Sequence, residues 1–168
     1  TLYLTDGILG GTGSIAMSKF IFGASSSGTD DLTVQDLTIT VNDFGSNVSY
    51  SQGGGTKTFN NVDMTVEGDL RLSSGNENFI LAGGSEITVA SGGLLDLEDA
   101  DGINVGTGGG KVTVLAGGTL DRSTNTGDTA IHAEVDLAGT LTVQSGKLEL
   151  AGGGLITNSA TVSSGAIL

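Results

Sequence analysis

The acidic segment D-L-E-D-A-D-G contains the densest group of candidate metal ligands in the chain. Its carboxylates belong to Asp96, Glu98, Asp99 and Asp101. Carboxylates on a turn, with backbone carbonyls nearby, can ligate Ca²⁺. The EF-hand register fails, because it would put Leu97 at the first ligand position and Gly108 at the twelfth. Asp96, Asp99 and Asp101 are therefore candidate calcium ligands outside any known loop motif, and a charged, solvated turn is the alternative.

The single histidine gives a second candidate site. His132 lies in D-T-A-I-H-A-E-V-D, where alternation places it on the same side of a strand as Glu134 and Asp136. Such a set could hold a divalent metal ion or act as an acid–base pair. A solvated polar face has the same pattern. No other cofactor is expected.

Catalytic patterns are missing from the sequence. There is no Cys, so thiol nucleophiles and thiolate zinc sites are excluded. The Gly-rich run at 106–110 lacks the Lys-Ser/Thr of a phosphate-binding loop. A polysaccharide lyase would need a basic subsite, but the six basic residues are scattered along the chain. We therefore expect a protein that is not an enzyme, with a polysaccharide-active enzyme as the weakest alternative.

Charge and length narrow the partners and the number of domains. The chain has 168 residues, which favours one domain over 1–168, and a formal net charge of −13. Nucleic acids and anionic lipids bind through Lys and Arg, so neither is expected as a partner. No apolar run is long enough to span a bilayer, so direct membrane insertion is not expected. Residue 1 is Thr, which suggests a processed product or a piece of something larger.

A short phrase, an apolar residue followed by Thr-Val, recurs along the chain. Its central threonines are Thr33, Thr65, Thr88, Thr113, Thr142 and Thr161. They recur about every 26 residues, which is typical of a repeat architecture. Most copies are followed by Gly and a second apolar pair, so each unit reads as strand, glycine turn and strand. A Thr-x-Thr pair at Thr38 and Thr40 also suggests an ice-binding face, but the charged residues expected around it argue against a regular Thr array.

Alternation assigns the two faces of each strand. In 87–97 the inward positions are Ile87, Val89, Leu95 and Leu97, and the outward positions are Thr88 and Asp96. One such unit cannot bury its apolar face alone, whereas stacked units form a continuous apolar column. The sequence thus predicts an all-β solenoid of about six to seven coils. Its longest insertions are expected at 42–61 and around 121–130. An antiparallel β-sandwich is the alternative, but it does not explain the recurring phrase.

Three phrases carry a resemblance to a known group of proteins. GGTLDRS (117–123), AGTLTVQSGKLELAGGG (138–154) and TVSSGAIL (161–168) resemble repeats of autotransporter passenger domains and filamentous-haemagglutinin-type bacterial adhesins. The likeness covers 61–168, expected to form regular coils, and extends loosely to 1–60, expected to be irregular. It implies a single-stranded right-handed parallel β-helix, secreted to the bacterial cell surface.

The resemblance also implies a role. We expect a non-enzymatic structural or adhesive segment, a β-helical stalk that stacks on further coils and contacts surface or host glycans or proteins. A self-assembling subunit of an extracellular filament or sheath is the alternative. In the phrase TVSSGAIL, Val162 and Leu168 are placed to join the apolar column. Because open strand edges with apolar side chains are templates for pairing, the predicted partners are adjacent coils of the same or neighbouring chains.

Overall fold

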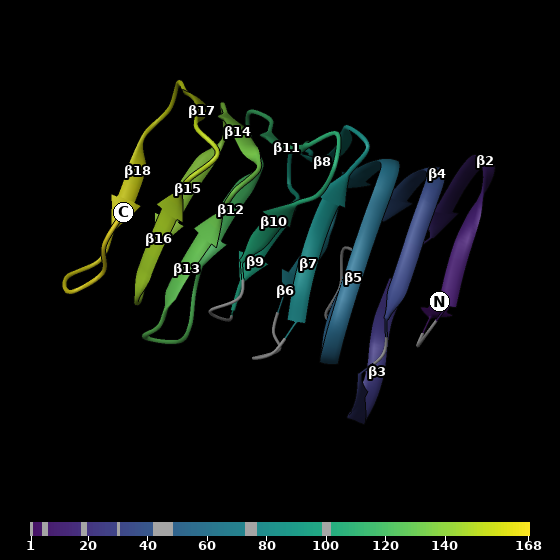
Figure 1. The fold of residues 1–168 in the computed structure, drawn as a ribbon. Coiled ribbons are helices and arrows are strands. Elements are labelled where there is room, and N and C mark those ends of the chain that lie inside the picture. Colours follow the sequence, from purple (N-terminus) through teal and green to yellow (C-terminus); the bar gives the residue numbers. More distant parts are fainter. Residues whose placement is uncertain are drawn as a thin grey trace.

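The chain folds into one stack of parallel β-strands. A computed structural model describes residues 2–4, 7–17, 20–29, 31–41, 49–72, 77–98 and 102–168. These residues form 18 strands in one continuous sheet, and every strand pairing in the described part of the chain is parallel. Figure 1 shows the strands side by side in chain order along the axis of the stack. The predicted all-β solenoid is confirmed.

The first wall of the solenoid, wall A, has one strand in each coil. Its strands are β1 (Leu2–Leu4), β3 (Phe20–Thr29), the first part of β5 (Ser49–Val66), β6 (Asp69–Leu72), β9 (Leu94–Leu97), β12 (Thr119–Arg122), β15 (Thr140–Val143) and β18 (Ala160–Val162). Each strand pairs with the next one in that order. From β6 onward these strands have three or four residues.

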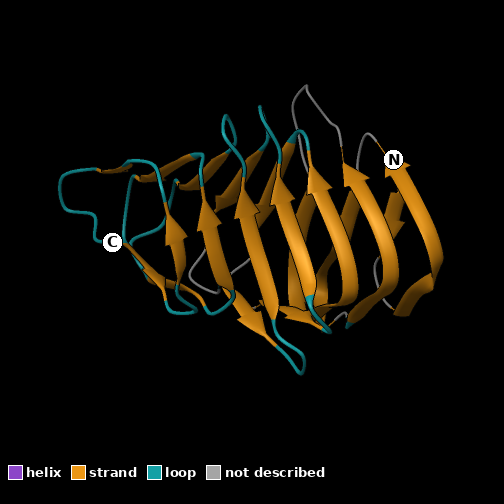
Figure 2. Cartoon of the chain, turned by 90° about the horizontal axis from the view of Figure 1, so that it is seen from above, coloured by secondary structure: helices purple, strands orange, loops and turns teal. Residues whose placement is uncertain are grey.

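The second wall, wall B, begins with long strands and continues with pairs of short ones. The long strands are β2 (Gly7–Met17), β4 (Leu32–Val41) and the rest of β5. The short pairs are β7 (Glu77–Ala82) with β8 (Ser85–Val89), β10 (Ile103–Val105) with β11 (Gly110–Val114), β13 (Asp128–Ile131) with β14 (Glu134–Leu137), and β16 (Lys147–Leu150) with β17 (Gly154–Ile156). Figure 2 shows the strands as successive slices of the stack, with the turns at their ends.

The change from one long strand to two short ones is encoded in one backbone conformation. Asp36 in β4 and Asn61 in β5 have φ values of 57° and 55°, so each long strand is bent at one left-handed residue. In the following coil this bend becomes the turn Gly83-Gly84, with φ values of 62° and 78°. Asn and Asp tolerate this conformation and Gly adopts it without strain. In the coil after β5 the strand therefore breaks at these two glycines, between β7 and β8.

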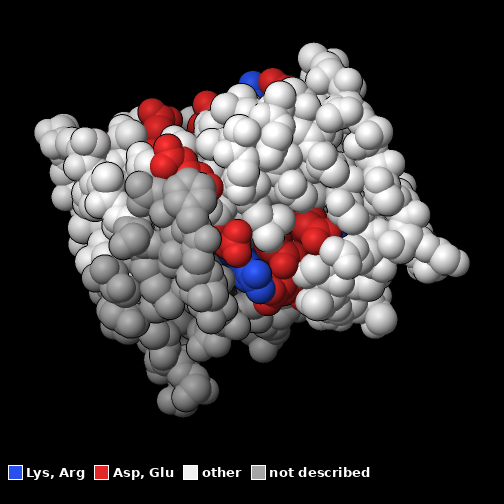
Figure 3. Space-filling view, turned by 180° about the vertical axis from the view of Figure 1, so that it is seen from behind, with Lys and Arg blue, Asp and Glu red and all other residues white. Residues whose placement is uncertain are grey.

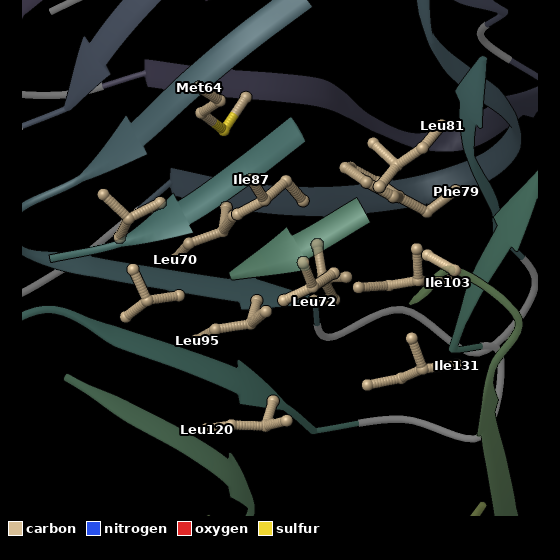
Figure 4. Close-up of a cluster of buried hydrophobic side chains, with 14 of the residues drawn as sticks. Met64, Leu70, Leu72, Phe79, Leu81, Ile87, Leu95, Ile103, Leu120 and Ile131 are labelled. Atoms are coloured by element: carbon tan, nitrogen blue, oxygen red, sulfur yellow. The ribbon is translucent and has the colours of Figure 1, made fainter. Parts of the chain in front are cut away.

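The core consists of columns of apolar side chains inside the stack. Ile39, Met64, Ile87, Val112 and Val135 form one column through their register on wall B. Leu70, Leu95, Leu120 and Leu141 form another on wall A. All of these side chains are buried. Figure 4 shows members of both columns pointing toward one another across the interior. The predicted inward positions in 87–97 are confirmed.

The register corrects the predicted alignment of the repeats. Thr65, Thr88 and Thr113 do stack on wall B, but the residue above them is Thr40, because Thr33 pairs with Thr58 instead. Thr142 and Thr161 stack on each other on wall A. The same apolar-Thr-Val phrase is thus used on both walls, since alternation fixes the face of a strand and not the wall to which it belongs.

The described residues show no long insertion at either predicted place. Within 42–61, the residues from Ser49 onward belong to β5, and Gly53, Gly54 and Gly55 lie inside that strand. The remaining part, 42–48, lies outside the described residues. Around 121–130, residues 123–127 connect β12 to β13, but this coil is not lengthened, because Leu120 and its register partner Leu141 are 21 residues apart, against 25 for Leu95 and Leu120. Val105 ends β10 and is exposed.

Gly92 and Gly93, which are adjacent at one corner, are needed for different reasons: Gly92 for its backbone conformation and Gly93 for the close approach of another coil. Gly92 has a φ of 86° and open space where a Cβ would stand, whereas a Cβ on Gly93 would lie 2.3 Å from the carbonyl oxygen of Val66 in the next coil. Gly92→Ala should therefore cost about 1 kcal/mol through backbone strain. Gly93→Ala should cost about 2–4 kcal/mol, because the two coils must separate. Urea unfolding of both variants checks this, and equal losses would contradict the close approach of the coils.

Candidate functional site

Only one of the three predicted calcium ligands lies in the described part of the chain. Asp96 is in β9 on the outer side of wall A, yet it is only 4% exposed. The Ser123 hydroxyl, from the connection after β12, donates a hydrogen bond of 2.7 Å to Asp96 Oδ1. Asp99 and Asp101 lie outside the described residues. The geometry of the proposed triad is therefore defined at Asp96 alone.

Asp96 belongs to a charged group that we call the Arg71 cluster. Its members are Asp69, Arg71, Asp96, Glu98 and Asp121. In register, Asp96 lies between Arg71 on β6 and Asp121 on β12. Arg71 Nη1 is 3.2 Å from Glu98 Oε1, and Arg71 Nη2 is 3.4 Å from Asp69 Oδ2. Gln144 Nε2 donates a 2.6 Å hydrogen bond to Asp121 Oδ2. Neighbouring coils thus assemble a group that residues 96–102 alone do not reveal.

Crowding of carboxylates sets the electrostatics of this cluster. Burial raises the pKa of Glu98, and the nearby Asp96 raises it further, against the opposing effect of Arg71. Burial, followed by Asp96, also raises the pKa of Asp121. Burial lowers the pKa of Arg71, but Glu98 and Asp69 more than offset this, so the net shift is upward. The cluster thus contains one guanidinium among four carboxylates, of which it contacts two, Asp69 and Glu98.

Metal binding has no preformed geometry in the described residues. They contain no group of three or more His, Asp or Glu side chains placed to hold a metal ion. In the Arg71 cluster, Glu98 and Asp69 form ion pairs with the guanidinium, and Asp96 accepts a hydrogen bond from the Ser123 hydroxyl. As it stands, this arrangement links coils to one another through side chains.

The second candidate site is also part of an inter-coil ion pair. His132 and Glu134 are exposed and Asp136 is half-buried, all on the outer side of wall B. Lys111 Nζ, from β11 in the preceding coil, lies 2.6 Å from Asp136 Oδ2 and 3.8 Å from Glu134 Oε1. The hydrogen bond from Lys111 lowers the pKa of Asp136. Lys111 is the member that sequence reasoning missed, because it is paired with Glu134 by register and is distant in the chain.

The outer side of wall B carries one rank of threonines. Thr40, Thr65, Thr88 and Thr113 stack in register. The neighbouring rank is Thr38, Asp63, Glu86, Lys111 and Glu134. The Thr-x-Thr pair of β4 is therefore not repeated in the following coils. A flat hydroxyl surface would need a second row of threonines beside the first, and mostly charged side chains occupy that row instead.

In the described part of the chain, basic side chains occur either inside the stack or against carboxylates. Lys57 and Arg122 are fully buried. Arg122 Nη1 donates a hydrogen bond of 2.7 Å to the carbonyl oxygen of Leu97, and Nη2 donates one of 3.4 Å to the carbonyl oxygen of Gly127. Lys147 Nζ is 3.0 Å from Glu149 Oε2 and 3.9 Å from Asp128 Oδ2. Figure 3 shows basic atoms touching acidic ones on one face. The described surface thus offers no separate basic patch.

Comparison with known proteins gives the chain no relative. No protein-family model, curated protein or solved structure matches it. Within the described residues there is no helix long and apolar enough to cross a membrane.

Proposed function

We propose that this chain is a non-enzymatic structural segment, a β-helical stalk of a secreted bacterial surface protein that stacks on further coils. The observation that carries the proposal is the continuity of the core columns. The same inner positions recur from coil to coil, so Val41, Val66, Val89, Val114 and Leu137 stack in register from β4 to β14. A structure of this kind converts the number of coils into length.

The distribution of side chains supports a spacer role. The polar residues that alternation suggested for chemistry are engaged between coils, as in the Lys111–Asp136 pair at 2.6 Å and the Arg71–Glu98 pair at 3.2 Å. Such contacts join neighbouring coils. Adhesive contacts with surface glycans or proteins would then come from the outer walls and the turns, where length and sequence vary between coils.

Duplication of one coil tests the stalk directly. Val89 and Val114 are register partners, so inserting a second copy of residues 90–114 after Val114 adds one coil without changing any inner position. The duplicated chain should unfold in one transition at an unchanged or higher temperature. It should also lengthen by about 4.8 Å along the axis, measurable by small-angle X-ray scattering.

The matched control inserts the same residues in scrambled order. That chain keeps composition and charge but loses the alternation, and it should unfold at a lower temperature. If the duplicated coil destabilises the protein as much as the scrambled one, the fold is a unit of fixed length and the stalk proposal is wrong.

A further inference from the structure

A polar pocket lies on the outer face of wall B, where its three long strands run side by side. It has a volume of about 290 Å³ and is lined by residues of β2, β4 and β5. Figure 1 shows these strands as neighbours, and the register pairs β2 with β4 and β4 with β5. The polar part of the lining consists of Thr12, Asp36, Thr38, Asn61 and Asp63. All five residues are exposed, so the pocket opens to solvent at the side of the stack.

The pocket coincides with a break in the regular register of wall B. The pairing of β2 with β4 shifts between Gly10 and Gly13, so that two residues, Gly11 and Thr12, stand opposite Asp36 alone. The pairing of β4 with β5 continues through the same region without a shift. Bulges of this kind re-aim side chains and are frequent beside functional sites. Uniform stacking does not need the extra residue, which brings Thr12 to the pocket.

Two of the lining residues hold each other in place. Asp36 and Asn61 both have left-handed φ values, 57° and 55°, and Asn61 Nδ2 donates a hydrogen bond of 2.8 Å to Asp36 Oδ1. The bend itself does not depend on their side chains, since Gly83 and Gly84 make it in the next coil. Residues other than glycine in this conformation cluster at ligand-binding sites. Because the bond engages an amide donor, the pair presents mainly oxygen acceptors.

The chemistry of the lining selects a ligand that donates hydrogen bonds and carries no negative charge. The carboxylates of Asp36 and Asp63 lie with one amide and two hydroxyls, and no Lys or Arg belongs to the lining. Carboxylates accept strong, charge-assisted hydrogen bonds and repel an anion. A hard cation such as Ca²⁺ takes about six to eight oxygen ligands, whereas the described residues contain no group of three metal-binding His, Asp or Glu side chains. A neutral molecule with several adjacent hydroxyl groups suits this lining.

We propose that this pocket binds one neutral sugar residue of a surface glycan. The inference rests on the proposed function, because it gives the adhesive contacts of the stalk a place and a ligand class. The volume is close to the lower limit of about 300–1,000 Å³ for small-molecule sites, which suits a single sugar ring. Adjacent hydroxyl groups of the ring donate to the carboxylates of Asp36 and Asp63. Since the pocket opens at the side, coils stacked along the axis do not cover it.

An NMR titration of the isotope-labelled chain tests this, with methyl α-mannopyranoside and methyl β-galactopyranoside as neutral probes. At least one of them should shift the amide signals of β2, β4 and β5 around the pocket, with a Kd of about 1 mM. Galacturonic acid is the matched probe, because it has the ring of galactose and an added carboxylate. It should leave these signals unchanged, since Asp36 and Asp63 repel it.

One substitution in the pocket and one beside it locate the site. Asp63→Ala should weaken binding of the neutral probe about tenfold or more, because it removes one of the two carboxylates. Glu86→Ala is the matched control, since Glu86 is the register partner of Asp63 in the next coil but does not line the pocket. It should bind the probe as the parent does. Circular dichroism melts of both variants check that they are folded.

Three results overturn the proposal. They are the absence of shifts with both glycosides at about 10 mM, ten times the expected Kd, equal binding of galacturonic acid, and undiminished binding by the Asp63→Ala chain. If any of these occurs while the duplicated coil is tolerated, the stalk proposal stands and only the sugar site is wrong. If the duplicated coil is not tolerated while Asp63→Ala weakens binding, the sugar site stands on a solenoid of fixed length.

Discussion

Val89→Asp should prevent the chain from folding, whereas Thr88→Asp should leave it folded. Val89 is fully buried in the column between Val66 and Val114, so the variant would bury an unpaired carboxylate. That costs several kcal/mol, a large share of the about 5–15 kcal/mol that stabilises a typical domain. Thr88 belongs to the outer threonine rank, where a carboxylate stays solvated and should cost at most about 1 kcal/mol.

Circular dichroism and thermal unfolding of the two variants measure this contrast. The pair is matched, because both introduce the same side chain into neighbouring positions of one strand. Similar losses of stability in both variants would show that the assigned inner and outer faces of β8 are wrong.

Arg122→Ala should be the most damaging loss of a polar side chain. The guanidinium is fully buried and holds the carbonyl oxygens of Leu97 and Gly127, so its removal leaves both without this donor and opens a cavity. Together these effects should cost about 3–5 kcal/mol. Arg122→Met fills most of the volume without the charge, and it should cost clearly less. Urea unfolding gives the free energies, and equal losses for Ala and Met would contradict a contribution from packing.

The walls of the solenoid were predictable where strict alternation and glycine corners coincide. Ile87, Val89, Leu95 and Leu97 are buried as predicted, because a strand with one apolar face has a single way of burying it. The corner at Gly92 and Gly93 follows from the same segment. Alternation does not predict which strands pair with each other, because the pairing depends on the number of residues in every coil.

The errors have physical causes that particular residues make clear. Thr33 and Thr142, like Thr88, stand between a branched apolar residue and Val, but they lie at other places around the coil, and local sequence does not encode that place. Gly53, Gly54 and Gly55 suggested a loop, yet neighbouring strands on both sides hold this segment extended.

The charged sites were harder to predict than the walls. Alternation from Leu120 places Arg122 inward, so the signal for its burial is present in the sequence. Lys111 and Arg71 joined their carboxylates only through register with other coils. Side chains that meet across coils are distant in the chain, and one sequence without its register does not bring them together.

The parallel stack also determines how the molecule would respond to force. Each coil is bonded only to the coils on either side of it, as the order of pairings along each wall shows. A pull on one end of the chain would load the terminal coil alone and detach it before the next one is stressed. Each detached coil of about 25 residues would release roughly 85 Å of extended chain. Under tension the protein would lengthen in successive steps of similar size, and a shortened stack would persist until the last coils separate.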